Sequence, residues 1–138
     1  MTPRRARLVE LVAAGDLSSR ERADLDKAIR AAEQSCRFEF SVFIGGAEGD
    51  SRVYARRLHA SLVAPNRSIL VMVDPTARVI EVVTGPEVRR HLTDREVELS
   101  VLAIQTDFAA NDFVGGLKRG IAMLAEHARP QNTLHVGS

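Results

Sequence analysis

The chain has 138 residues, and its 19 Lys and Arg against 18 Asp and Glu give a formal net charge of +1. This length fits one domain with a core of its own, and the near-zero charge provides no overall field for nucleic acid or anionic lipid. The single cysteine excludes an internal disulfide, and no apolar run is long enough to span a bilayer. The composition therefore predicts a cytoplasmic protein without a membrane span or a nucleic-acid partner.

The domain is expected over residues 15–129. Residues 1–14 form an N-terminal segment whose apolar stretch, from Leu8 to Val12, fits a short strand or a cover over the core. Residues 130–138 follow the helix-breaking Pro130 and are expected to form a flexible C-terminal tail.

The first half of the domain has the pattern of a β-α-β unit. Ser18 and Glu21 have the spacing of a capping box, which predicts a helix starting after Ser18 and ending before Arg37. Residues 38–44 alternate between apolar and polar positions as a strand does, and Asp50 or Ser51 can cap the next helix. A strand, a helix and a strand in this order predict a parallel pair.

The middle of the chain predicts a β-hairpin. Residues 68–73 are almost continuously apolar and β-branched, which is typical of a strand covered on both faces. Asp74, Pro75 and Thr76 then make a turn, and a second Val- and Ile-rich run extends from Arg78 to Gly85. The chain is therefore expected to build a mixed sheet of three to four strands.

Two further helices are predicted in the last third. Thr93 and Glu96 form a second capping box, and the apolar positions behind it cover more than one face, so this helix is expected to be well buried. A last helix follows Asn111 and Asp112. It contains three glycines, Gly115, Gly116 and Gly120. Glycine weakens a helix interior, so a close approach of another element is expected there. Together these patterns predict an α/β domain with helices packed on the sheet.

Four stretches, in this order and spacing, carry a resemblance to a known family. They are Gly15-Asp-Leu-Ser-Ser-Arg-Glu21, the hairpin runs from Ser68 and from Arg78, Leu92-Thr-Asp-Arg-Glu96, and Phe108-Ala-Ala-Asn-Asp-Phe-Val-Gly-Gly-Leu117. They resemble the TPM domain superfamily, and among its members the chain is most similar to the actinobacterial family DUF5130. One departure is Asn111, which stands where the superfamily has glycine.

The resemblance implies a TPM-like fold and a choice of functions. Members of the superfamily are associated with photosystem repair, with receptor assembly, and with a weak acid phosphatase activity accompanied by calcium binding. What the resemblance implies for this chain is thus either a protein-assembly role or a phosphatase-like hydrolase.

An acidic cluster is the candidate site. Asp50 and Asp74 follow the two parallel strands, whose carboxyl ends meet at one sheet edge, and the predicted helices bring Asp107 and Asp112 towards it. Four carboxylates would suit Ca²⁺ or Mg²⁺, and Arg78 could steady a phosphate. Cap and turn roles explain the same aspartates without a ligand, and this interpretation is favoured.

Other motifs offer less chemistry. The glycine-rich loop at 45–50 lacks the Walker A ending and carries acidic residues, so it is interpreted as a flexible turn. The four histidines have no metal-ligand spacing, Cys36 lies on an apolar helix face, and no serine has a nucleophile-elbow context.

Two functional hypotheses follow. The favoured one is a cytoplasmic, TPM-like module that is non-catalytic and binds an unidentified protein partner. The alternative is a weak divalent-metal-dependent phosphatase that uses Asp50, Asp74, Asp107, Asp112 and Arg78.

Overall fold

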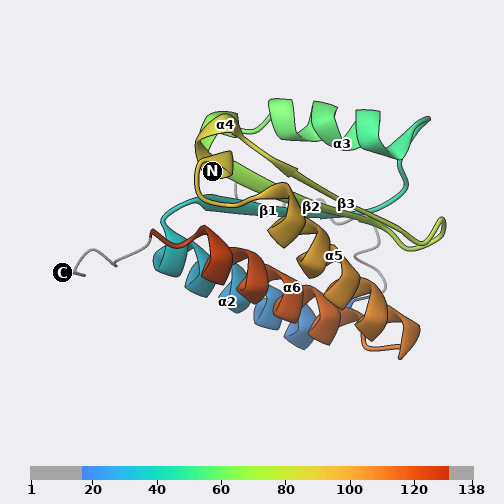
Figure 1. Cartoon of the computed structure of the whole chain (residues 1–138). Helices are drawn as coiled ribbons and strands as arrows, with labels where there is room; N and C mark the ends of the chain where they lie inside the picture. Colours follow the sequence, from blue (N-terminus) through green and yellow to red (C-terminus); the bar gives the residue numbers. More distant parts are fainter. Residues whose placement is uncertain (1–16, 131–138) are drawn as a thin grey trace.

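The computed structural model describes residues 17–130 (Figure 1). The predicted N-terminal segment 1–14 and the tail beyond Pro130 lie outside these residues. The elements follow one another as α2 (Ser19–Cys36), β1 (Glu39–Ile44), α3 (Ser51–Ala60), the 3₁₀ turn η2 (Pro65–Arg67), β2 (Ser68–Asp74), β3 (Val79–Thr84), α4 (Pro86–Arg89), α5 (Asp94–Ala109) and α6 (Phe113–Ala128).

Within the described residues the sheet has three strands, in the order β1-β2-β3. β1 runs parallel to β2, with Glu39 opposite Ser68, and β2 runs antiparallel to β3, with Ile69 opposite Thr84. Every residue of the central strand β2 is buried, as the continuous apolar run predicted. The predicted α/β class, the parallel pair and the hairpin are confirmed.

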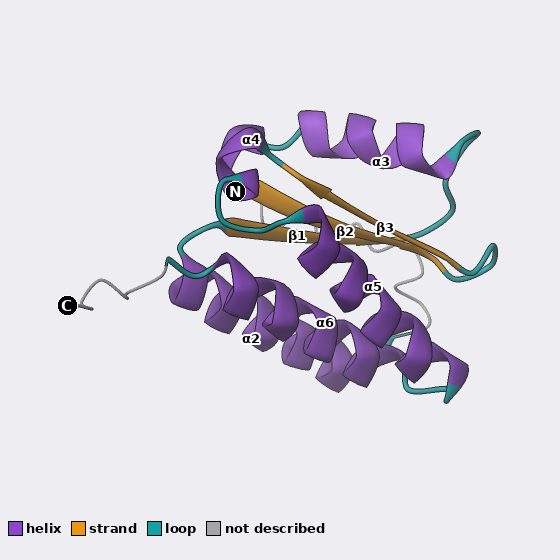
Figure 2. Ribbon diagram, in the orientation of Figure 1, coloured by secondary structure: helices purple, strands orange, loops and turns teal. Residues whose placement is uncertain are grey.

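Helices cover the two faces of the sheet unequally (Figure 2). α2, α5 and α6 lie on one face, where the larger core includes Phe40, Ile69, Val71 and Ile104. Among the described helices that pack on the sheet, α3 lies on the other face, over a smaller core around Ala55. The alternation of side chains along each strand explains the division, because neighbouring residues point to opposite faces.

The helix-start signals are confirmed in detail. The Ser18 hydroxyl accepts from Glu21 N at 3.0 Å, and the Thr93 hydroxyl accepts from Glu96 N at 3.2 Å. In each case the Glu side chain accepts a hydrogen bond from the backbone N–H of the cap residue, which completes the capping box. Asp50, rather than Ser51, caps α3.

The prediction of a well-buried α5 is wrong. Only Ser100 and Ile104 of this helix are buried, while Leu99 and Leu102 are 44% and 58% exposed. The helix packs against α6 and β3 along one stripe, and the apolar residues outside that stripe lie at the surface.

The glycines of α6 allow that helix to approach α5 closely. A Cβ on Gly120 would overlap the Ile104 side chain, and one on Gly116 would lie 2.9 Å from Asp107 Cβ. The expected close approach is therefore confirmed, and it fixes α5 and the α5–α6 turn beside the hairpin.

Candidate functional site: a cleft at the carboxyl edge of the sheet

A cleft of about 480 Å³ opens where the β2–β3 turn meets the α5–α6 turn. We call it the carboxyl-edge cleft. Its lining comes from the hairpin and from the two helix ends: Val73, Asp74, Pro75, Arg78, Val79, Ile80, Gln105, Phe108, Ala109, Asn111 and Phe113. The two lining segments are separated in the sequence by the rest of β3, by α4 and by most of α5, and they meet at the sheet edge that the parallel strands predicted.

Asp74 is the acidic group in this cleft, and its carboxylate already has structural partners. It accepts hydrogen bonds from Ala47 N and Ala77 N, both at 3.1 Å, and is only 7% exposed. These backbone N–H groups lower the pKa of Asp74 below its ordinary value, although burial opposes them. Asp74 therefore stays ionised and ties the loop after β1 to the hairpin turn.

Polar groups without a partner surround Asp74. The side chains of Arg78, Gln105 and Asn111 make no hydrogen bond or ion pair within residues 17–130. Arg78 and Asn111 also have left-handed backbone conformations, with φ of 59° and 64°. Asn tolerates this region better than most residues, which fits its presence at position 111. These side chains are available to a ligand.

An aromatic pair forms the apolar side of the cleft. Phe108 at the end of α5 and Phe113 at the start of α6 stack with ring centroids 4.7 Å apart. Ile80 and Val73 lie on the same lining. An apolar surface with a few polar groups beside it is the usual composition of a ligand-binding pocket.

The other predicted site residues serve as caps and ion pairs. Asp50 accepts from Val53 N at 2.9 Å and Asp112 accepts from Gly115 N at 3.1 Å, each at a helix start. Asp107 accepts from Arg119 Nε at 2.6 Å, and this contact raises the pKa of Arg119. Of the five predicted residues, the cleft brings together Asp74 and Arg78.

The described residues do not fit the predicted metal site. Between residues 17 and 130 there is no group of three or more His, Cys, Asp or Glu side chains that could hold an ion. The physical reason is that Asp50 and Asp112 cap different helices, while Asp74 is bound by two amides. A site for Ca²⁺ needs six to eight oxygen ligands, which these separate positions do not supply.

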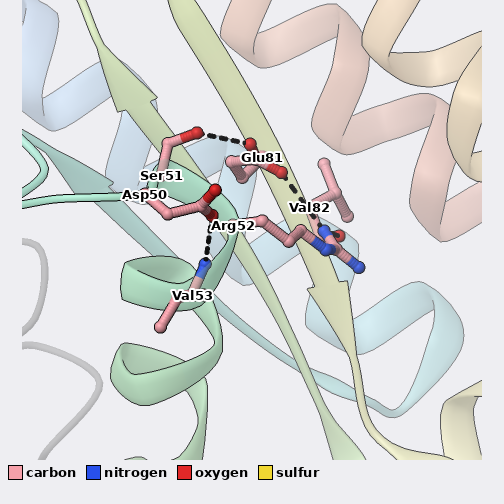
Figure 3. A network of polar contacts seen from close by, with 6 residues as sticks. All are labelled: Asp50, Ser51, Arg52, Val53, Glu81 and Val82. Atoms are coloured by element: carbon pink, nitrogen blue, oxygen red, sulfur yellow. Dashed lines mark hydrogen bonds and ion pairs between the residues drawn. The ribbon is translucent and has the colours of Figure 1, made fainter.

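A polar network at the start of α3 was not predicted (Figure 3). Ser51 Oγ donates to Glu81 Oε2 at 2.7 Å, and Arg52 Nη1 donates to Glu81 Oε1 at 3.3 Å and to Val82 O at 2.8 Å. The network joins α3 to β3 across 30 residues of sequence. The sequence signal for it is weak, because it consists of one charged residue, Glu81, in a mostly apolar strand.

His59 and Cys36 are structural. His59 is buried, and its Nε2 lies 3.0 Å from Ser68 O. Cys36 is buried as expected, and burial raises the pKa of its thiol. Neither side chain has the surroundings of a nucleophile or metal ligand.

Comparison with known proteins identifies the family. The profile described as "Domain of unknown function (DUF5130)" matches residues 6–125. The chain therefore belongs to the DUF5130 family, and the resemblance drawn from its sequence is confirmed at this level.

Relatives occur in Mycobacterium tuberculosis. The chain is 28% identical over 106 residues to "Uncharacterized protein Rv2468c" of strain ATCC 25618 / H37Rv, and equally to "Uncharacterized protein MT2543" of strain CDC 1551 / Oshkosh. The aligned part covers 77% of this chain and 64% of each relative, so the chain spans less than two thirds of their length.

Solved structures share the fold. The BA42 protein of Bizionia argentinensis is similar with a TM-score of 0.72 and 21% identity, over 81% of each chain. The N-terminal domain of cg2496 from Corynebacterium glutamicum gives a TM-score of 0.68 and 15% identity, over 86% of this chain and 79% of that one. These identities support a common fold. No helix within residues 17–130 has the length and apolarity needed to cross a membrane.

Proposed function

We propose that this protein is a non-catalytic module that binds a segment of a protein partner in the carboxyl-edge cleft. The observation that carries the proposal is the composition of the cleft, in which the stacked pair Phe108 and Phe113 lies beside Arg78, whose guanidinium has no partner among residues 17–130. An aromatic surface takes an apolar side chain, and a guanidinium next to it takes a carboxylate or a backbone carbonyl.

The groups in the cleft favour binding over catalysis. A general base must be free to take a proton, whereas both hydrogen bonds to Asp74 hold its carboxylate in the ionised form and in one position. The remaining polar side chains, Gln105, Asn111 and Arg78, do not act as proton carriers near neutral pH. They suit recognition.

The phosphatase alternative stands on fewer residues than the sequence suggested. Arg78 in the cleft could still contact a phosphate, but Asp50, Asp107 and Asp112 serve other partners. We derive no metal-dependent step for it, since the carboxylates do not form a site.

Two finer proposals accompany the function. The order of the elements agrees with the order on which the TPM resemblance was drawn, and from it we propose that DUF5130 belongs to the TPM superfamily. A cytoplasmic location is proposed from the composition, and fractionation of cells that express the tagged natural gene tests it.

Selection of peptides tests the proposed function directly. A random peptide library displayed on phage is selected against the full-length protein, and the enriched peptides are synthesised and titrated by calorimetry. We expect binders with an aromatic or branched apolar residue whose affinity falls at least about tenfold in Phe113→Ala, since such a contact is worth 1.4 kcal/mol or more.

A second variant guards against misfolding. Phe113 packs against the core, so Phe113→Ala could lower the stability of the fold as well as the affinity for peptides. Arg78 has no side-chain partner among residues 17–130, so Arg78→Glu should lower the affinity for the same peptides without removing a contact within the fold. The matched control is Arg20→Glu, an exposed arginine on α2 with the same change of charge. If no peptides bind, or if binding ignores Phe113 and Arg78, the proposed function is wrong.

A further inference from the structure

The carboxyl-edge cleft is one end of a longer groove along β3. A second cleft of about 560 Å³ shares Ile80 and Gln105 with it, and we call this the middle cleft. A third, of about 500 Å³, shares Arg52 and Val82 with the middle cleft, and we call it the arginine cleft. The three clefts form one β3 groove that follows the strand from its first residues to its last.

The arginine cleft differs in charge from the opposite end. Arg52, Arg56 and Arg89 line it, and Asp94 is the carboxylate on the same lining. Arg52 is paired with Glu81, which leaves Arg56 and Arg89 without a carboxylate partner among residues 17–130. His59 also lies on this lining, with its Nε2 engaged by Ser68 O. The cleft therefore contains two guanidinium groups that have no ion-pair partner within the described chain, and the single negative charge of Asp94 offsets part of their positive charge.

Two outward carbonyls of β3 at this end are already hydrogen-bonded. Gly85 N donates to Ser68 O, so the alternation of the antiparallel ladder directs the backbone groups of Val82 and Thr84 away from β2. Arg52 Nη1 donates to Val82 O at 2.8 Å, as Figure 3 shows, and Arg89 Nη1 donates to Thr84 O. A partner therefore meets guanidinium groups here instead of free strand carbonyls.

Each of these arginines keeps donors for a ligand. A guanidinium carries five N–H donors, and both Arg52 and Arg89 use only Nη1 in hydrogen bonds within the described chain. Carboxylates match guanidinium geometry and can be bound by two parallel hydrogen bonds. The contacts to Val82 and Thr84 hold the arginines in place for that purpose.

We infer that the arginine cleft binds acidic side chains of the same partner segment whose apolar residue occupies the carboxyl-edge cleft. This inference rests on the proposed function. Ile80 and Thr84, at the two ends, are four residues apart on β3, which corresponds to about 14 Å at 3.4 Å per residue. An extended partner therefore carries its acidic residues roughly four to six positions from the apolar one.

The middle cleft determines which residues the partner segment can carry between its apolar and its acidic end. Glu81, Asp94 and Glu98 line it together with Val97, Val101 and Leu102. Acidic residues of a partner are repelled there, so the recognised segment is acidic at one end and apolar or basic in the middle.

The peptides selected above test this arrangement. We expect the selected peptides to carry a pair of Asp or Glu residues roughly four to six positions from the apolar residue. Their affinity for the Arg56→Gln/Arg89→Gln variant should be at least about tenfold weaker than for the wild type. Added salt should weaken their binding to the wild type more than their binding to this variant. The control is Arg20→Gln/Arg30→Gln, which removes the same charge from exposed positions on α2.

The outcomes separate the two proposals. Peptides that depend on Phe113 but show no acidic bias, or lose no more affinity in the Arg56/Arg89 variant than in the control, overturn the acidic-partner inference and leave the binding function standing. Absence of Phe113-dependent peptides overturns both. Arg89 donates a hydrogen bond to Thr84 O, so its substitution could unfold the double variant. In that case Arg56→Gln alone, which changes an exposed side chain, provides the affinity comparison.

Discussion

Asp74 connects two separate segments of backbone through one carboxylate. Asp74→Asn leaves one acceptor oxygen for the two amides of Ala47 and Ala77, so we expect a loss of about 1–3 kcal/mol in the free energy of unfolding at pH 7. Urea denaturation measures it. Asp26→Asn is the control, since Asp26 makes no hydrogen bond or ion pair within residues 17–130.

The same carboxylate makes stability depend on pH in one direction. Its folded pKa lies below the ordinary value of 3.8, so its contribution is present above that value and is lost as the pH falls through the folded pKa. Wild type should therefore lose stability more steeply than Asp74→Asn between about pH 5 and pH 2. Equal slopes in urea denaturation at several pH values would contradict this assignment.

Residue roles were harder to predict than residue positions. The sequence placed Asp74 and Arg78 at the correct sheet edge, because a turn after a buried strand is a local pattern. It could not reveal that Ala47 and Ala77 direct their N–H groups at Asp74, which depends on the path of two loops. The buried position of His59 and the partners of Glu81 are likewise tertiary properties.

At the scale of elements, the close contact between α5 and α6 depends on glycine at position 120, which has no side chain to separate the helices. Gly120→Ala adds a Cβ that overlaps Ile104, so we expect a net destabilisation of about 1–3 kcal/mol although alanine favours a helix. Gly46→Ala is the control, because nothing lies within 4 Å of its added Cβ. A Gly120→Ala protein as stable as wild type in urea would show that the helices separate at little cost.

Element boundaries followed from the sequence where capping residues mark them, as at Ser18, Asp50 and Thr93. The exposure of Leu99 and Leu102 did not follow from the sequence. Hydrophobic content indicates how much of a helix could be buried. The sheet formed by residues 17–130 has three strands, and α6 and α2 on the same face limit the surface available to α5.

For the whole molecule, the dispersed carboxylates predict indifference to divalent cations. A ligand that binds only the folded state raises the unfolding midpoint as its concentration passes the dissociation constant. We expect the chelator-stripped protein to unfold at the same temperature with and without millimolar Ca²⁺ or Mg²⁺ in calorimetry. A clear rise that disappears in Asp74→Asn would restore the metal site and the phosphatase alternative.

The contacts of Arg52 and Arg89 with β3 also affect how two copies of the protein can associate. A free strand edge invites pairing with another sheet, which is a common start of aggregation. Arg52 and Arg89 occupy the outward carbonyls of Val82 and Thr84, so two copies brought close together, on a shared scaffold or in one fusion protein, cannot join their sheets at these positions while the contacts last. Pairing of two sheets through the Val82 and Thr84 carbonyls of β3 is thereby disfavoured.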